Sequence, residues 1–194
     1  MPKRPDTPAP TPGPLITGSY RQGPRFNTYR ENGTHDWVLV YNLSGHAQFN
    51  HIKGNVSTGP GDMILLKPNT RHDYGTAKDQ PFWEPLWAHF IPRPSWMEWL
   101  DWPEIAPGIL FLHLNKHEQQ VRIIKRFREM LRLNAAAYRL REALAMNAME
   151  EILLRCNLAN PKSDTAHLDG RIRQSLDYIC GHFTEPLTVG RIAE

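Results

Sequence analysis

Aromatic side chains with polar tips alternate along residues 82–90 in a way that could bind a carbohydrate. In an extended strand alternate side chains share a face, and one face here would carry Trp83, Pro85, Trp87 and His89. His72 and Tyr74 share a face of an earlier segment in the same way. An indole ring packs on the apolar C–H face of a sugar, while phenol and guanidinium groups bond its hydroxyls. Periodicity alone favours the simpler interpretation that these rings form a core.

A metal centre is a second chemistry that these histidines could support. Gly61, Pro68 and His72 resemble the second motif of cupin-type barrels, in which the glycine makes a tight turn and the proline fixes a loop. The first cupin motif would add an H-x-H pair and a glutamate. No H-x-H occurs in the chain, since His35 and His46 stand apart. We therefore expect no metal or other cofactor, and expect His72 to be structural or to line a cavity.

The segment from 15 to 115 has the pattern of short strands that would hold such side chains. Along residues 37–43 apolar side chains alternate on two faces, and Ser44-Gly45 signals a turn. Further strands are expected at 47–51, 56–58 and 63–66, separated by turn formers at 53–55 and 59–62. Closely spaced short strands are typical of an antiparallel barrel or jelly roll.

Two long helices are expected to follow the barrel, over residues 116–159. Val121, Ile124, Phe127 or Arg128, and Leu131 recur at helical spacing. A second helix is expected over 138–158, with Asn134 near the break between the two. Residues 160–168 read as a linker, and 169–194 begin a third, incomplete region.

Composition sets broad limits on the class of protein. Of the 194 residues 40% are hydrophobic, and 23 Lys+Arg against 20 Asp+Glu give a net charge of +3. That balance permits a nucleic-acid partner without arguing for one. The two cysteines give no disulfide framework, and no apolar run reaches the length of a signal peptide core or a membrane span. We expect a cytoplasmic protein that does not enter a membrane.

The first 14 residues form a proline-rich arm, with six of the 17 prolines of the chain. Proline removes backbone donors and favours extended conformations. We expect a mobile arm, and composition alone favours a tail without a role.

Several blocks of the chain together resemble a known family. The strongest is W-x-x-F-x-P-R-x-x-W-x-E-W-L-x-W-P, which runs from Trp87 to Pro103. A second block is Pro60-Gly61-Asp62 with the strand residues that follow it. Over most of residues 15–194 the sequence resembles the AraC-type transcription regulators. The resemblance implies a cupin-like jelly-roll barrel that binds a small sugar, two long helices that dimerise, and the start of a helix-turn-helix DNA-binding domain at 169–194. It also implies that the protein acts as an activator or repressor and is not an enzyme.

The resemblance also implies a binding site. In the family an arginine, a tyrosine and a tryptophan bind the sugar, and they align with Arg30, Tyr74 and Trp87. Arg30 would bond hydroxyls and the ring oxygen, Tyr74 would bond a hydroxyl, and Trp87 would stack. Tyr20 aligns loosely with a pocket threonine of the family. His72 and His89 complete the expected set.

Two departures from the family pattern bear on the ligand. Pro85 stands where the family's arabinose sensor has a histidine, so one or two sugar hydrogen bonds must be lost or replaced, by His89 or Trp83 on the same face. Unpaired hydroxyls in a closed pocket cost about 1–3 kcal/mol each. The expected ligand is therefore arabinose, a related pentose or another small polyol. The arm also lacks an obvious match to the family's arm, which folds over bound sugar.

The second helix carries a seam that predicts a homodimer. Heptad spacing of four and three relates Leu140, Leu144, Asn147, Glu151, Leu154 and Leu158. A second apolar face of this helix, with Ala143, Met146, Leu153 and Cys156, would pack on the barrel. A single broad core face is the alternative. Operator DNA would be bound only by the complete C-terminal domain, because this sequence ends before a recognition helix.

Two further functions remain open at this point. The same fold could serve a cupin-type sugar isomerase or epimerase, or a free-standing sugar-binding module. The missing metal motif and the start of a DNA-binding domain favour the regulator.

Overall fold

A computed structural model describes residues 4–163 together with 175, 178, 179 and 182. Nearly all of the region expected to begin the DNA-binding domain, 169–194, lies outside the described residues, as does most of the predicted linker. Residues up to Asn160 form one compact unit.

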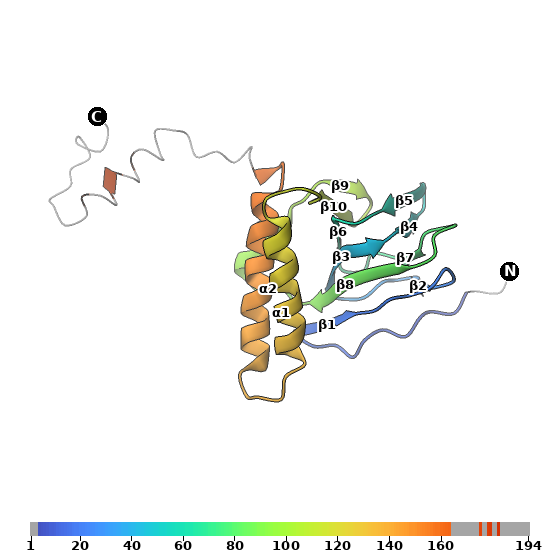
Figure 1. Ribbon diagram of the computed structural model, residues 1–194, viewed down its shortest axis with the longest axis horizontal. Helices are drawn as coiled ribbons and strands as arrows, with labels where there is room; N and C mark the ends of the chain where they lie inside the picture. Colours follow the sequence, from blue (N-terminus) through green and yellow to red (C-terminus); the bar gives the residue numbers. More distant parts are fainter. Residues whose placement is uncertain (1–3, 164–174, 176–177, 180–181, 183–194) are drawn as a thin grey trace. The chain divides into compact units, whose positions relative to one another are not determined.

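Two antiparallel sheets face each other in this unit (Figure 1). The six-stranded sheet has the order β1-β8-β3-β6-β10-β9, and the four-stranded sheet has the order β2-β7-β4-β5. In chain order the strands are β1 (Leu15–Ser19), β2 (Asn27–Arg30), β3 (Trp37–Gly45), β4 (Ala47–His51), β5 (Gly54–Thr58), β6 (Asp62–Leu66), β7 (His72–Thr76), β8 (Trp83–Phe90), β9 (Glu104–Ala106) and β10 (Ile109–His113). The mainly β, jelly-roll-like prediction for 15–115 is confirmed. The turn expected at Ser44-Gly45 is not found there, because β3 continues through Gly45, which pairs with Trp83 at a φ of 70°.

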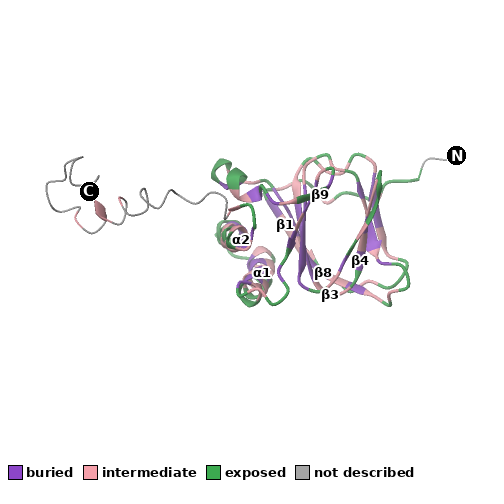
Figure 2. Cartoon of the chain, turned by 90° about the horizontal axis from the view of Figure 1, so that it is seen from above, coloured by how far each residue is buried: buried purple, intermediate pink, exposed green. Residues whose placement is uncertain are grey.

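A 3-10 helix and two α-helices complete the unit: η1 (Pro94–Leu100), α1 (Gln120–Asn134) and α2 (Arg141–Leu158). The two α-helices pack against each other and cover the outer face of the six-stranded sheet (Figure 2). The helical pair predicted after the barrel is confirmed. Its second member begins at Arg141 instead of Tyr138, so Leu140 is the residue that precedes the helix.

The six-stranded sheet is buried on both faces, which explains the apolar alternation in its central strand. Val38 and Val40 point between the sheets, into the cluster with Ile64 and Trp83. Leu39 and Tyr41 join the larger cluster under the helices. The two faces predicted for residues 37–43 therefore meet two different cores.

The buried face of α1 agrees in part with the predicted row. Of the predicted positions Phe127 is buried, and Ile124 and Leu131 pack against the core beneath the helices. Val121 is 73% exposed, and Arg128, the alternative to Phe127, is also exposed. The centre of the buried face is shifted from the predicted row: its buried residues are Ile123, Phe127, Met130 and Leu133.

The N-terminal arm also differs from expectation. Residues described from 4 onward lie beside β2 instead of standing away from the barrel. The Thr7 amide donates to the Tyr29 carbonyl at 2.6 Å, and the Tyr29 amide donates to the Thr7 hydroxyl at 3.0 Å. Asp6 accepts from the Glu31 amide at 3.1 Å. The arm thus adds strand-like pairing to the free edge of the smaller sheet, a tendency of exposed edges.

Candidate functional site

A cavity of about 320 Å³ lies between the two sheets and is closed on one side by the arm. Strands β2, β3, β7 and β8 supply its barrel walls. Its lining consists of Thr7, Pro8, Ala9, Pro10, Tyr20, Phe26, Thr28, Arg30, Val38, Val40, Tyr74, Trp87 and His89. The structure thus brings together five of the six residues predicted for a sugar site: Tyr20, Arg30, Tyr74, Trp87 and His89.

Trp87 forms one wall, and its position depends on a glycine in the neighbouring strand. Gly18 pairs with Trp87 across β1 and β8. A Cβ atom at Gly18 would come within 2.3 Å of the indole ring, so only glycine leaves room for it. The indole Nε1 is buried and has no hydrogen-bond partner. Trp87 therefore offers a flat apolar face and an unused donor, and Gly18 is a positioning residue that the sequence reasoning missed.

Arg30 is buried, at 7% exposure, and its partners are neutral. Its Nε donates to the Thr7 carbonyl at 3.1 Å, and its Nη2 donates to the Pro8 carbonyl at 2.9 Å. Nη1 lies 2.9 Å from Nδ1 of His72. These contacts use three of the five N–H groups of the guanidinium. The arm is therefore held over the cavity by the same side chain that was predicted to bind the ligand.

His72 does not line the cavity but lies behind Arg30. An arginine can only donate, so His72 Nδ1 accepts the bond and the proton of the neutral ring sits on Nε2. Nε2 is buried without a partner. Burial above all, and then the neighbouring Arg30 charge, lowers the pKa of His72 to about 3. A neutral His72 thus orients Arg30, so any part in binding is exerted through that arginine.

His89 brings a carboxylate close to the cavity. Its Nδ1 lies 3.1 and 3.2 Å from the two oxygens of Asp36. Burial is the largest single influence and raises the pKa of Asp36, but the hydrogen bonds with His89 and Thr34, together with the attraction to His89, outweigh it and lower the pKa of that carboxyl. Asp36 is therefore an anion that accepts from Nδ1 of His89, which leaves the other ring nitrogen of His89 for the cavity.

Some of the aromatic residues line the cavity and others form the core, so each of the two interpretations holds for different residues. Trp83 is fully buried, touches Phe49 and Tyr74, and belongs to the core. Neither Trp83 nor Pro85 is among the lining residues, so Trp83 does not replace the donor that Pro85 lacks. Tyr20 and Tyr74 do line the cavity, and burial raises the pKa of each, which keeps both hydroxyls protonated.

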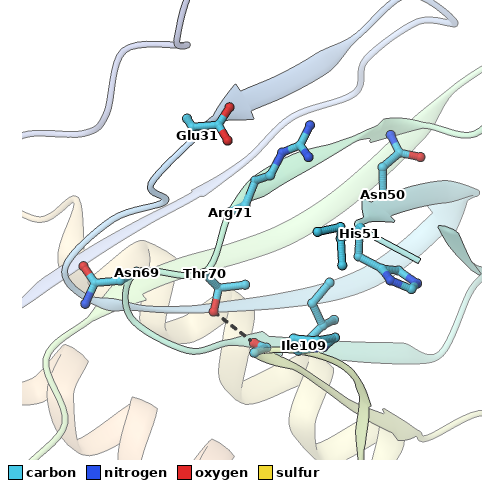
Figure 3. Close-up of a pocket in the computed structure, with 10 residues that line it drawn as sticks. Glu31, Asn50, His51, Asn69, Thr70, Arg71 and Ile109 are labelled. Carbon is cyan, nitrogen blue, oxygen red and sulfur yellow. Dashed lines mark hydrogen bonds between the residues drawn. The ribbon is translucent and has the colours of Figure 1, made fainter. Parts of the chain in front are cut away.

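A second hollow, of about 460 Å³, is lined by residues just after β2, at the β4–β5 turn, in the β6–β7 loop and at the β9–β10 turn (Figure 3). Glu31, Arg71, Asn50 and His51 surround it, and Thr70 donates to the Gly108 carbonyl at its base. Arg71 pairs with Asp73 at 3.1 Å, and Glu31 accepts from the Tyr29 hydroxyl. Its charged groups are thus satisfied within the chain, which makes the inner cavity the better candidate site.

Within residues 4–163 and the few described beyond them, no group of three or more His, Cys, Asp or Glu side chains is placed to hold a metal ion. None of the helices in the described part of the chain has the length and apolar character needed to cross a membrane.

Comparison with known proteins gives consistent matches over this unit. Residues 14–153 match the family described as AraC-like ligand binding domain. The chain is 29% identical over 156 residues to the arabinose operon regulatory protein of Salmonella typhimurium, and 28% identical to that of Escherichia coli. These alignments cover 80% of this chain but 55% and 53% of the relatives, so the chain spans about half their length.

Among solved structures, the fold is similar to that of apo ToxT K231A from Vibrio cholerae. The TM-score is 0.53 at 9% identity, covering 93% of this chain and 69% of that one. At this identity the likeness concerns the fold alone.

Proposed function

Because the chain belongs to the family of AraC-like ligand-binding domains, we propose that it is the effector-binding and dimerisation part of a sugar-responsive transcription regulator. This family consists of transcription regulators and not of enzymes, so the isomerase and epimerase alternatives are set aside. The cavity between the sheets carries the proposal, because it joins an aromatic wall, a buried arginine and an arm that closes over both.

We propose a small sugar as the effector, either arabinose, a related pentose or another small polyol. The cavity volume lies at the lower end of the range typical of ligand pockets, which fits a small ligand. Trp87 supplies a stacking face, and Arg30, Tyr74, Tyr20 and His89 surround it with polar groups. The relatives named above are arabinose operon regulators by name, which makes pentoses the first ligands to test.

We propose that α2 forms the homodimer contact. The leucines of the predicted seam are left uncovered, with Leu144 41%, Leu154 42% and Leu158 67% exposed. Leu140, at 55%, lies just before the helix. The opposite face of α2 is fully buried against the rest of the unit, with Met149, Ile152 and Cys156 at 0% exposure. A helix with two apolar faces requires two partners, and an antiparallel copy of α2 is the one proposed.

In the complete regulator, binding of the effector would change how a C-terminal helix-turn-helix domain engages operator DNA, to activate or to repress. The resemblance of 169–194 to the start of such a domain supports this. The working compartment we propose is the cytoplasm, where an operator is accessible.

A thermal-shift screen of the chain against pentoses and hexoses tests the proposal. A ligand at 100 times its dissociation constant adds about 2.7 kcal/mol to stability. We expect at least one small sugar or sugar derivative to raise the melting temperature in wild type, and not in Trp87→Ala. The Trp99→Ala variant, outside the cavity, is the control. The absence of any shift across the panel would contradict the proposed function.

A further inference from the structure

We propose that the effector carries a carboxylate, so that the cavity prefers a sugar acid to the corresponding neutral sugar. This inference rests on the proposed function, which it refines by naming the chemical class of the ligand. It is drawn from the charges and the hydrogen-bonding groups that the cavity walls present.

The first observation is an unbalanced charge. Arg30 is the permanently charged residue of the lining, and no Asp or Glu contributes to that lining. None of the ion pairs within the described residues involves Arg30. Asp36, a carboxylate outside the lining, is engaged by His89. Buried charges in proteins are normally paired, and Arg30 has two neutral carbonyls and a neutral imidazole instead.

The second observation is an excess of donors. Three of the five N–H groups of Arg30 bond Thr7, Pro8 and His72, and a fourth bonds the Tyr74 hydroxyl, so that one remains. The indole N–H of Trp87 is also buried without a partner. Neither residue can accept a hydrogen bond. The lining contains no carboxylate, Asn or Gln side chain that could accept strongly from a ligand hydroxyl.

A carboxylate matches this wall better than a neutral sugar does. Each hydroxyl of a neutral sugar brings a proton that needs an acceptor, and a buried hydroxyl without one is costly. An ionised carboxylate only accepts, and it can take a charge-assisted hydrogen bond from the remaining N–H group of Arg30. The hydroxyls of Tyr20, Tyr74 and Thr28, which both donate and accept, would serve the remaining hydroxyls of the ligand.

The position of Arg30 also explains how binding of such a ligand would affect the N-terminal arm. The guanidinium already bonds the Thr7 and Pro8 carbonyls. A carboxylate on its remaining N–H group would neutralise its charge without removing these bonds. The ligand would then stabilise the closed arm through Arg30, with His72 holding the arginine from behind.

Isothermal titration of the chain with matched pairs tests the inference directly. The pairs are arabinose with arabinonate, xylose with xylonate, and galactose with galacturonate, all at equal ionic strength and pH 7.5. The acid of the best-binding pair is expected to bind about tenfold or more tightly than its neutral partner, as a charge-assisted bond implies. In Arg30→Gln this ratio should fall to near one, while Arg30→Lys should keep part of it. Arg122→Gln, a change on the exposed face of α1, is the matched control and should keep the full ratio.

The outcomes separate this inference from the proposed function. Neutral sugars that bind as tightly as their acids would overturn the carboxylate preference and leave the sugar-binding function intact. A preference for the acid that survives in a folded Arg30→Gln protein would overturn the role of Arg30. If neither member of any pair binds, both the inference and the proposed function fail.

Discussion

At the scale of single residues, the candidate site depends on residues that do not line the cavity themselves. Gly18 leaves the space that the Trp87 ring occupies, and His72 holds Arg30 by accepting from Nη1. Both act by positioning a residue that lines the cavity. Each can be tested by a substitution that leaves the lining itself unchanged.

Replacing Gly18 with alanine should displace Trp87. The new Cβ would overlap the indole, and overpacking of this kind costs about 1–3 kcal/mol. We expect a lower midpoint in urea unfolding together with weaker ligand binding. Gly23→Ala is the control, since a Cβ there meets no atom within 4 Å. Equal ligand affinity in Gly18→Ala and wild type would contradict the role assigned to Gly18.

His72 should make the protein less stable in mild acid. Its pKa is about 3 in the folded chain and about 6.5 when unfolded, so the unfolded chain binds a proton that the folded chain excludes. Stability from this residue is therefore full above about pH 7 and falls as the pH drops below 6.5, by about 2 kcal/mol at pH 5.

His72→Asn keeps an acceptor near the position of Nδ1 and removes this titration. Urea unfolding from pH 8 to pH 5 should show a flatter dependence in the variant than in wild type. Parallel curves for the two proteins would show that His72 is not buried as a neutral ring.

At the scale of elements, α2 and the arm are the two parts to which the proposed function assigns a role beyond packing. The seam leucines of α2 are exposed, while Glu151 in the same seam pairs with Arg126 and Arg155 of its own chain at 2.7 Å. The arm covers the cavity through backbone bonds with Tyr29 and Arg30. Each element can be altered without changing the barrel core.

The substitutions Leu144→Glu and Leu154→Glu together should produce a monomer. Paired carboxylates on the seam would be buried without partners in a dimer, which is strongly unfavourable. Sedimentation velocity should show a dimer for wild type and for Val121→Glu, a more exposed apolar position on α1. A monomeric wild type, or a double variant that still dimerises, would argue against the α2 contact.

Removal of residues 2–10 should weaken effector binding. Arg30 would lose two hydrogen bonds, and the cavity would lose the wall made by Thr7, Pro8, Ala9 and Pro10. We expect an affinity at least about tenfold lower, mostly through faster dissociation, measured by stopped-flow fluorescence. An unchanged dissociation rate would mean that the arm does not close the site.

The sequence predicted strands and helices better than it predicted which of their faces pack together. The alternation separated the two faces of β3 and placed Trp87 and His89 on one face of β8, because strand period depends only on local geometry. It did not say which face of β3 would share the cavity with Trp87. The row predicted for α1 was displaced because two apolar rows compete and only the tertiary contact chooses between them. The docked arm was not foreseen, since its bonds depend on tertiary pairing with Tyr29, Arg30 and Glu31 that composition does not reveal.

At the scale of the whole unit, the six-stranded sheet separates the candidate cavity from the candidate dimer helix. Strand β8 presents Trp87 and His89 to the cavity and Leu86, Ala88 and Phe90 to the core beneath the helices. Just after β8, Arg93 pairs with Glu150 of α2 at 2.7 Å and lies over the Trp96 ring. The conspicuous tryptophan block after β8 thus joins the cavity strand to α2.

Tryptophan fluorescence during ligand titration tests most directly whether the cavity is the effector site. Trp87 is one of six tryptophans, and it alone of the six lines the cavity. Titration of wild type with the strongest ligand of the thermal-shift screen should change the emission in a saturable way. Trp87→Phe should abolish that change while the other five tryptophans still report a folded protein. A saturable change of the same size in Trp87→Phe would place the ligand elsewhere and contradict the account.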